Sequence, residues 1–188
     1  MEWIILGVIV LLLLLLLWLV VIYNRLVALR QTVGQSWADI EVQLKQRHDL
    51  IPNLVETVKG YAAHERGTLE EVIRARNSAV AAHDPKAASV AEGQLTGALS
   101  RLFALAEAYP DLKANQNFLS LQGELSSLET KIAAARRFFN NAVAEFNAAI
   151  QSVPAVFFAG SLGFTPRDFF ELAEAERVAV QTPPSVKF

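Results

Sequence analysis

The sequence contains no cysteine, which excludes disulfides and thiolate metal ligands. Only three of its 188 residues are histidine, and its lysines and arginines are scattered, so no basic face for nucleic acid stands out. No stretch alternates apolar and polar residues with a period of two, so strands are not needed. The pattern predicts an all-α protein: a membrane helix followed by one helical domain.

The longest uncharged run is WIILGVIVLLLLLLLWLVVIY, residues 3–23. As a helix it is about 30 Å long, the thickness of the hydrocarbon core of a bilayer. Trp3, Trp18 and Tyr23 lie towards its ends, where amphipathic rings prefer the interface. A cleavable signal would need a cationic start and a shorter apolar run. We therefore predict that residues 1–23 are a permanent single-pass anchor.

The charges that flank this run predict its orientation. Arg25 and Arg30 follow the run closely, and no lysine or arginine precedes it. Because basic residues are retained on the cytoplasmic side, we expect the N-terminus outside a bacterial-type cell membrane and the helical domain in the cytoplasm.

Beyond the anchor, apolar residues recur in rows of seven, which is typical of long helices that present one stripe to a bundle. Asp84 suits the N-cap of a second helix, with Pro85 at its first position. The rows and breaks predict an antiparallel up-down bundle over residues 24–181 and an extended tail at 182–188. The expected helices cover residues 24–82, 86–109, 113–153 and 166–180, with Thr165 and Asp168 capping the last.

Pro52 falls inside the first expected helix, where it removes the hydrogen bond to the carbonyl of His48. The apolar rows keep their phase across it, so we expect a kinked but continuous helix. The alternative is two helices joined by a turn at residues 50–52.

Two charged residues, Arg47 and Glu65, occupy row positions where apolar side chains belong. They are about 27 Å apart along a helix and cannot pair with each other. If the first and third long helices are parallel, Glu65 lies level with Arg136. We therefore propose an ion pair between these two residues.

The histidines do not form a recognisable metal site. Three residues before His48, His64 and His83 there is no carboxylate, and four residues after them there is no ligand. We expect no metal, no cofactor and no catalytic residue, and interpret the polar side chains beside Pro52 as packing contacts. The alternative is an uncharacterised hydrolase that uses His48 and His64.

Helix lengths suggest an interface near the membrane. The first expected helix is about 88 Å long and the third about 57 Å, so residues 24–44 would form an uncovered stalk. Its apolar stripe would then mark an interface. The alternative is that the third helix covers it. The candidate interface residues are Leu26, Val33, Trp37 and Ile40.

Three long strings resemble the LemA family: QRHDLIPNLVETVKGYAAHE, residues 107–154, and the ending FFELAEAERVAVQTPPSVKF. The resemblance covers essentially the whole chain and implies a membrane helix followed by an antiparallel helical domain. It implies no reaction, substrate or cofactor. A departure is Phe138-Phe139, where an aromatic hydroxyl is more usual nearby. The matching positions include Asp49, Pro52, Asn53, Tyr109, Pro110, Asp111, Asn117, Phe118, Gln122, Arg136 and Asn147.

The function that these patterns favour is a membrane-anchored helical-bundle scaffold or adaptor. We expect it to act through protein contacts, as a homo-oligomer or with a membrane-protein partner, and to bind neither nucleic acid nor a small-molecule substrate. The alternatives are a membrane-shaping oligomer and the hydrolase above.

Overall fold

A single helix, α1 (Glu2–Lys59), contains the whole apolar run and continues far beyond it. In the computed structural model, which describes residues 1–171, this helix is long and apolar enough to cross a membrane. Its most apolar window of 18 residues has a mean hydropathy of 3.5, and none of that window is buried in the protein. The predicted anchor is therefore continuous with the helix that follows it.

The chain divides into two compact units, which we describe separately. Unit 1 consists of Met1–Ser36 and Phe138–Arg167. Among the described residues, unit 2 consists of Trp37–Arg137 and residues 168–171. The helices α1 and α5 (Gln116–Gln151) contribute residues to both units.

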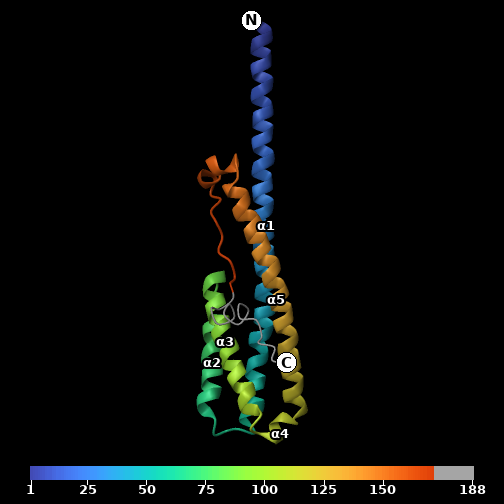
Figure 1. Cartoon of the computed structure of the whole chain (residues 1–188), viewed down its shortest axis with the longest axis vertical. Helices are drawn as coiled ribbons and strands as arrows, with labels where there is room; N and C mark the ends of the chain where they lie inside the picture. The colour runs from blue at the N-terminus through green and yellow to red at the C-terminus, as the bar shows by residue number, and fades with distance from the viewer. Residues whose placement is uncertain (172–188) are drawn as a thin grey trace, which may run out of the picture. The chain divides into compact units, whose positions relative to one another are not determined.

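Unit 2 is an antiparallel bundle. Besides its parts of α1 and α5 it contains α2 (Arg66–Val80), α3 (Pro85–Ala106) and the single turn α4 (Pro110–Lys113). Its long helices run in alternating directions along the chain (Figure 1). All of its regular elements within the described residues are helical. Its core is an apolar cluster built from every helix, which includes Ile51, Leu54, Val58, Leu69, Val72, Leu95, Leu99, Leu102, Leu112, Phe118 and Leu125.

Local signals explain two of the boundaries in unit 2. Asp84 caps α3 by accepting a hydrogen bond from the amide of Ala87 at 2.8 Å, and Pro85 is the first helical residue, as predicted. Asn115 accepts a bond from the amide of Phe118 at 3.0 Å and so caps α5. The expected helix 113–153 is therefore the turn α4 followed by α5.

The expected helix 24–82 is wrong at its centre. It continues through Pro52, as predicted, but α1 ends at Lys59 and α2 begins at Arg66. Glycine at positions 60 and 67 brackets the reversal, and glycine is disfavoured in helices by about 1 kcal/mol relative to alanine. The apolar rows keep their phase across the turn because Val58 and Val72 enter the same core from two helices.

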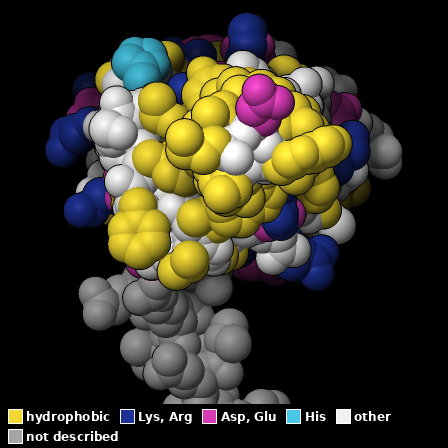
Figure 2. All heavy atoms as spheres, turned by 90° about the horizontal axis from the view of Figure 1, so that it is seen from above, with side chains coloured by type: hydrophobic (Ala, Val, Ile, Leu, Met, Phe, Trp, Pro, Cys, Tyr) yellow, Lys and Arg dark blue, Asp and Glu magenta, His cyan; other side chains and the backbone are white. Residues whose placement is uncertain are grey.

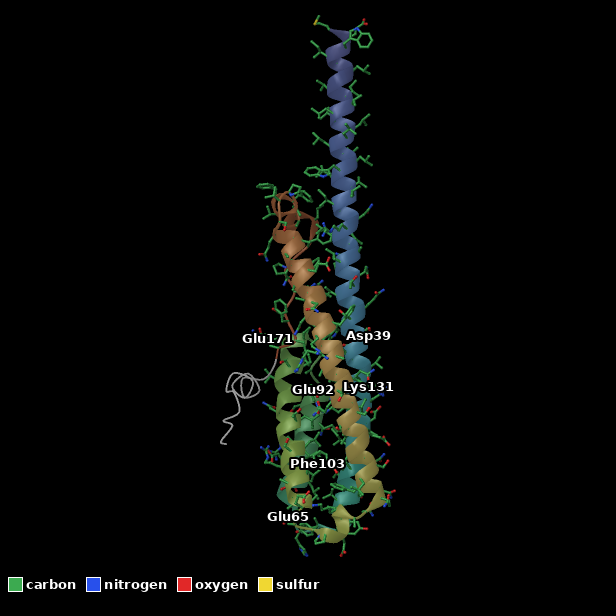
Figure 3. The ribbon with its side chains drawn as sticks, turned by 45° about the vertical axis from the view of Figure 1, so that its right-hand side comes forward. Asp39, Glu65, Glu92, Phe103, Lys131 and Glu171 are labelled. Carbon is green, nitrogen blue, oxygen red and sulfur yellow. The ribbon has the colours of Figure 1, made fainter. Side chains whose placement is uncertain are left out.

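This extra reversal also overturns the proposed Glu65–Arg136 ion pair. It makes α5 antiparallel to α1 in unit 2, whereas the pair required parallel helices (Figure 1). Glu65 lies near one end of unit 2, well away from Lys131 of α5 (Figure 3). Arg136 is farther along α5 still, about 30 Å from the start of that helix.

In unit 1, α5 is followed by two short 3₁₀ helices, η1 (Ala155–Phe157) and η2 (Gly160–Leu162). Gly163 then turns the chain with a φ of 77°, a conformation that favours glycine. The side chain of Asn147 bonds the backbone of Arg167 twice, as donor at 2.9 Å and as acceptor at 2.8 Å. The core of this unit consists of Leu26, Val33, Phe139, Val143, Phe146, Ile150, Ala155, Ala159 and Phe164.

Two further expectations need correction. The uncovered stalk is wrong, because Leu26, Val33 and Ile40 are at most 6 % exposed within the single chain. Trp37 is half-buried and packs its ring against Phe170. The helix expected at 166–180 is absent from residues 166–171, and its remainder lies outside the described residues. The stalk was expected because the third predicted helix was taken to run parallel to the first, whereas α5 runs antiparallel to α1 (Figure 1).

Candidate functional site

Four polar side chains meet inside unit 2, on two of its helices. Arg47 and His48 belong to α1, Glu92 and Thr96 to α3. Arg47 is only 2 % exposed, and His48 and Glu92 are also buried. Glu92 lies on the face of α3 that carries Leu95 and Leu99, so the fold of α3 directs its carboxylate inward.

The side chains of this cluster are joined by short hydrogen bonds and ion pairs. Arg47 donates from Nη1 to Glu92 Oε2 at 2.8 Å, and from Nη2 to Thr96 Oγ1 at 2.8 Å. Nη2 also pairs with Oε1 of Glu129, on α5, at 2.6 Å. His48 Nε2 lies 2.6 Å from Glu92 Oε1. Arg47 thus joins α1 to both α3 and α5, and one carboxylate holds both Arg47 and His48.

Beside this cluster, Pro52 gives rise to a second polar contact between helices. Because proline has no amide hydrogen, the carbonyl of His48 receives no helical hydrogen bond from position 52. Arg76 of α2 donates its Nε to that carbonyl at 2.8 Å. The proline therefore creates an acceptor on α1 that α2 fills, which ties the two helices together.

This geometry favours packing over catalysis. The groups that carry charge face each other, and the side chains of Arg47, His48 and Glu92 are each less than a tenth exposed. His64 is on the exposed turn after α1, about 17 Å or more beyond His48 along the helix, so the fold does not bring the two histidines together. No group of three or more potential metal ligands occurs among residues 1–171.

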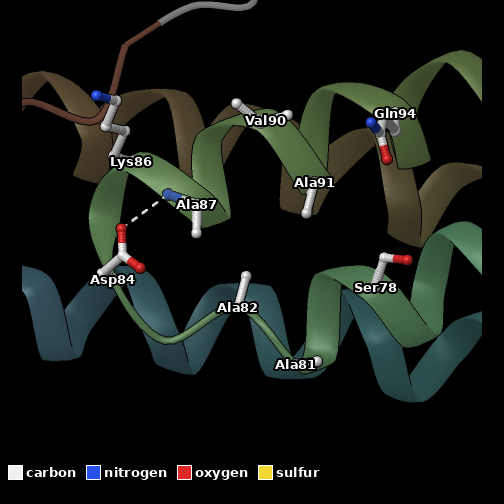
Figure 4. A pocket seen from close by; sticks show the side chains of 9 residues that line it. All are labelled: Ser78, Ala81, Ala82, Asp84, Lys86, Ala87, Val90, Ala91 and Gln94. Atoms are coloured by element: carbon white, nitrogen blue, oxygen red, sulfur yellow. Dashed lines mark hydrogen bonds between the residues drawn. The ribbon is translucent and has the colours of Figure 1, made fainter.

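Two hollows on unit 2 lie along α2 and α3. One groove near the start of α3 is lined by small side chains such as Ala82, Ala87 and Ala91 (Figure 4). Another, of about 440 Å³, lies between the two helices and is flanked by Glu71, Arg74 and Arg101. Neither groove is lined by Arg47, His48 or Glu92.

Tyrosine hydroxyls fasten the end of unit 2 where the chain reverses. Asn115 donates its amide to the hydroxyl of Tyr61 at 2.9 Å. The hydroxyl of Tyr109 donates to Glu65 Oε1 at 3.1 Å. Glu65, expected to pair with Arg136, therefore bonds Tyr109 instead.

The bond to Glu65 raises the pKa of Tyr109, because the neutral phenol donates to the carboxylate and the phenolate would be repelled by it. A raised folded-state pKa means that the bond stabilises the fold fully below the unfolded pKa, near 10, and is lost as pH rises through the folded pKa. We expect Tyr109→Phe to be less stable than the unchanged protein at neutral pH, with a difference that shrinks above about pH 10. Denaturant titrations across this range would measure it. A difference that stays constant into alkaline solution would contradict the role of the hydroxyl.

The other positions that carry the family resemblance are spread over the fold. Asp49 is exposed and bonds Lys45 at 2.7 Å, and this bond lowers the pKa of its carboxyl. Phe118 is buried with its ring edge-on to Phe103. Pro110 begins α4. The remaining positions are the exposed Asn53, Asp111, Asn117 and Gln122, and the half-buried Arg136 and Asn147.

The sequence identified Arg47 as a charged residue in an apolar row, but its partners were not predicted. The signal for Glu92 was present, since Ala88, Glu92 and Leu95 share one face of α3 at helical spacing. Thr96 and Glu129 gave no such signal, because threonine and glutamate are common on solvated faces. Arg76 also gave none: Pro52 indicates that the carbonyl of His48 lacks its helical hydrogen bond, but the sequence does not show which side chain donates to it.

Comparison with known proteins shows which family this chain matches. A family model described as "LemA family" matches residues 36–188. The chain is 25 % identical to "Magnetosome protein MamQ" of Magnetospirillum gryphiswaldense over 187 residues, covering 86 % of this chain and 69 % of the relative. It is 24 % identical to "Magnetosome protein MamQ 2" of Paramagnetospirillum magneticum with the same coverage. It is 28 % identical to "Protein LemA" of Metamycoplasma hominis over 163 residues, covering 85 % of this chain and 73 % of the relative.

Proposed function

This membrane-associated chain belongs to the LemA family, and we propose that it is a membrane-anchored helical scaffold that acts by binding protein segments, without catalysis. The observation that carries the proposal is the mutual pairing of Arg47, His48 and Glu92 inside unit 2. Charges held in this way fix which helices pack together. They do not line either of the two grooves described above.

The surface that would receive a partner is the groove between α2 and α3. A groove between two antiparallel helices fits the ridge of a third helix, and small residues let backbones approach closely. Gly93 and Gly97 lie along this groove, with Ala75 facing them from α2. The same two helices also carry exposed apolar side chains, Ile73 and Val80 on α2 and Val90 on α3. The proposed occupant is a helical protein segment, which a second copy of this chain could also supply.

Site-specific crosslinking in membranes tests the proposal. A photoreactive amino acid at Gln94, which lines the groove, should capture a protein, and the covalent product should be resolved by mass spectrometry. The matched control is the same amino acid at Ser126, an exposed position of α5. Capture of a helix at Gln94 alone supports the scaffold. Capture at neither position, with the protein folded and in the membrane, would count against it.

We further propose that unit 2 faces the cytoplasm, because Arg25 and Arg30 follow the apolar run of α1. A reporter that is active only in the cytoplasm, fused after Phe188, should be active. An inactive fusion, together with activity of a reporter that requires export, would reverse the orientation.

A further inference from the structure

The segment that follows α5 in unit 1, residues 153–163, contains no charged side chain. Its side chains divide into two sets. Ala155 and Ala159 are buried against the unit. Four larger apolar side chains face outward, with exposed fractions of 76 % for Val153, 47 % for Val156, 79 % for Phe157 and 47 % for Leu162. A cluster of this kind on a short segment marks a surface that contacts something other than water.

This segment is fixed beside the end of the membrane-spanning run. Phe164, the next residue, is buried, and its ring packs edge-on against Tyr23 at 5.6 Å. The guanidinium of Arg30 lies 5.1 Å from the centre of the same ring. Tyr23 is the last residue of the uncharged run of α1. The outward apolar side chains are therefore held at the level where α1 leaves the hydrocarbon core.

The backbone around the segment is braced. Gly163 makes the turn with its positive φ, and the two bonds from Asn147 hold Arg167 against α5. Phe146 of α5 packs its ring 6.5 Å from that of Phe164. Viewed from above, hydrophobic side chains cover most of the face around the start of α1 (Figure 2).

We propose that residues 153–163 insert into the interfacial layer of the bilayer, next to α1, as a second membrane contact. The occupant is lipid because the apolar surface of the segment adjoins the lipid-facing surface of the span through the contact of Phe164 with Tyr23. Tyrosine and arginine at the same level are suited to the headgroup region, and uncharged apolar side chains to the boundary beneath it. The inference rests on the membrane span of α1 and not on the scaffold role.

The absence of cysteine permits a direct test on the full chain. Phe157→Cys introduces a single thiol for an environment-sensitive fluorophore, and the labelled protein is reconstituted into phosphatidylcholine vesicles. Lipids that carry a spin label at a shallow acyl position then quench only probes in the outer part of the bilayer. Leu13→Cys reports the span itself. Phe138→Cys is the matched control, since it is an exposed phenylalanine of the same unit about 20 Å before the end of α5.

We expect spin-labelled lipid to reduce emission from the probe at position 157 about twofold, with little effect at position 138. Leu162→Cys should behave like Phe157→Cys, which guards against a local effect of one substitution. Equal, weak quenching at 157 and 138, with strong quenching of a deeper label at 13, would overturn the inference while leaving the span intact. Blue-shifted emission at 157 without lipid quenching would also overturn it, because a protein surface would then cover the segment.

Discussion

Replacing Glu92 by alanine should lower the free energy of unfolding by about 3–5 kcal/mol, because it leaves the buried guanidinium of Arg47 without its main counter-charge. The half-exposed carboxylate of Glu129 remains, paired with Nη2. Arg47 Nε already has no hydrogen-bond partner among the described residues, so the guanidinium is not fully satisfied even before Glu92 is removed. Denaturant unfolding in mild detergent, followed by far-UV circular dichroism, would measure the loss.

The control for this prediction is an exposed ion pair on the same helix. Asp49→Ala removes the bridge to Lys45. Both side chains are more than half exposed, so this replacement should cost far less than Glu92→Ala. Combining Arg47→Met with Glu92→Leu should recover part of the loss caused by Glu92→Ala, since apolar replacements leave no unpaired charge on these two positions. If Glu92→Ala costs no more than Asp49→Ala, the cluster does not stabilise the fold as described.

Replacing Arg76 by leucine should lower the free energy of unfolding by about 1–3 kcal/mol, because the carbonyl of His48 then loses its donor. The cost should fall by more than half when Pro52 is also changed to alanine. Alanine restores an amide hydrogen at position 52, and the helix itself then satisfies that carbonyl. Pro52 is exposed, so its replacement leaves no cavity in the core. The same unfolding measurement on the four proteins completes a double-mutant cycle.

Arg74→Leu is the matched control for Arg76→Leu. Arg74 is an exposed arginine of α2 that lines the groove towards α3 and bears no relation to position 52. Its replacement should have the same small effect with proline or alanine at position 52. If Arg76→Leu likewise costs the same in both backgrounds, the link between Arg76 and the proline is wrong.

Much of the fold follows from local pattern. The uncharged run predicted the span, the apolar rows predicted the helices, and Asp84-Pro85 predicted the start of α3. Continuity through Pro52 was also predicted, because the rows kept their phase. The same phase hid the reversal after Lys59, since two helices that face one core can keep a shared period. The kink at Pro52 stays a prediction.

The candidate site was harder to predict because its partners are distant in the sequence. Arg47 and Glu92 are separated by 45 positions, and Arg76 reaches His48 across 28. Arg47 and Glu65 were recognised as charged residues in apolar rows. The partner predicted for Glu65 depended on which helices are parallel, and that prediction was wrong, whereas no partner was predicted for Arg47.

The sequence by itself determined the membrane span, the all-helical class and the family, because helix formation and membrane insertion depend on composition and spacing within a few turns. Only the tertiary structure decided the direction of α5, the partners of Arg47 and Glu65, and the cover over Leu26 and Val33. The physical reason is that one short turn at Gly60 reverses the direction of the helices that follow it. The local signal for such a turn is weak, yet the turn decides which residues distant in the sequence come into contact.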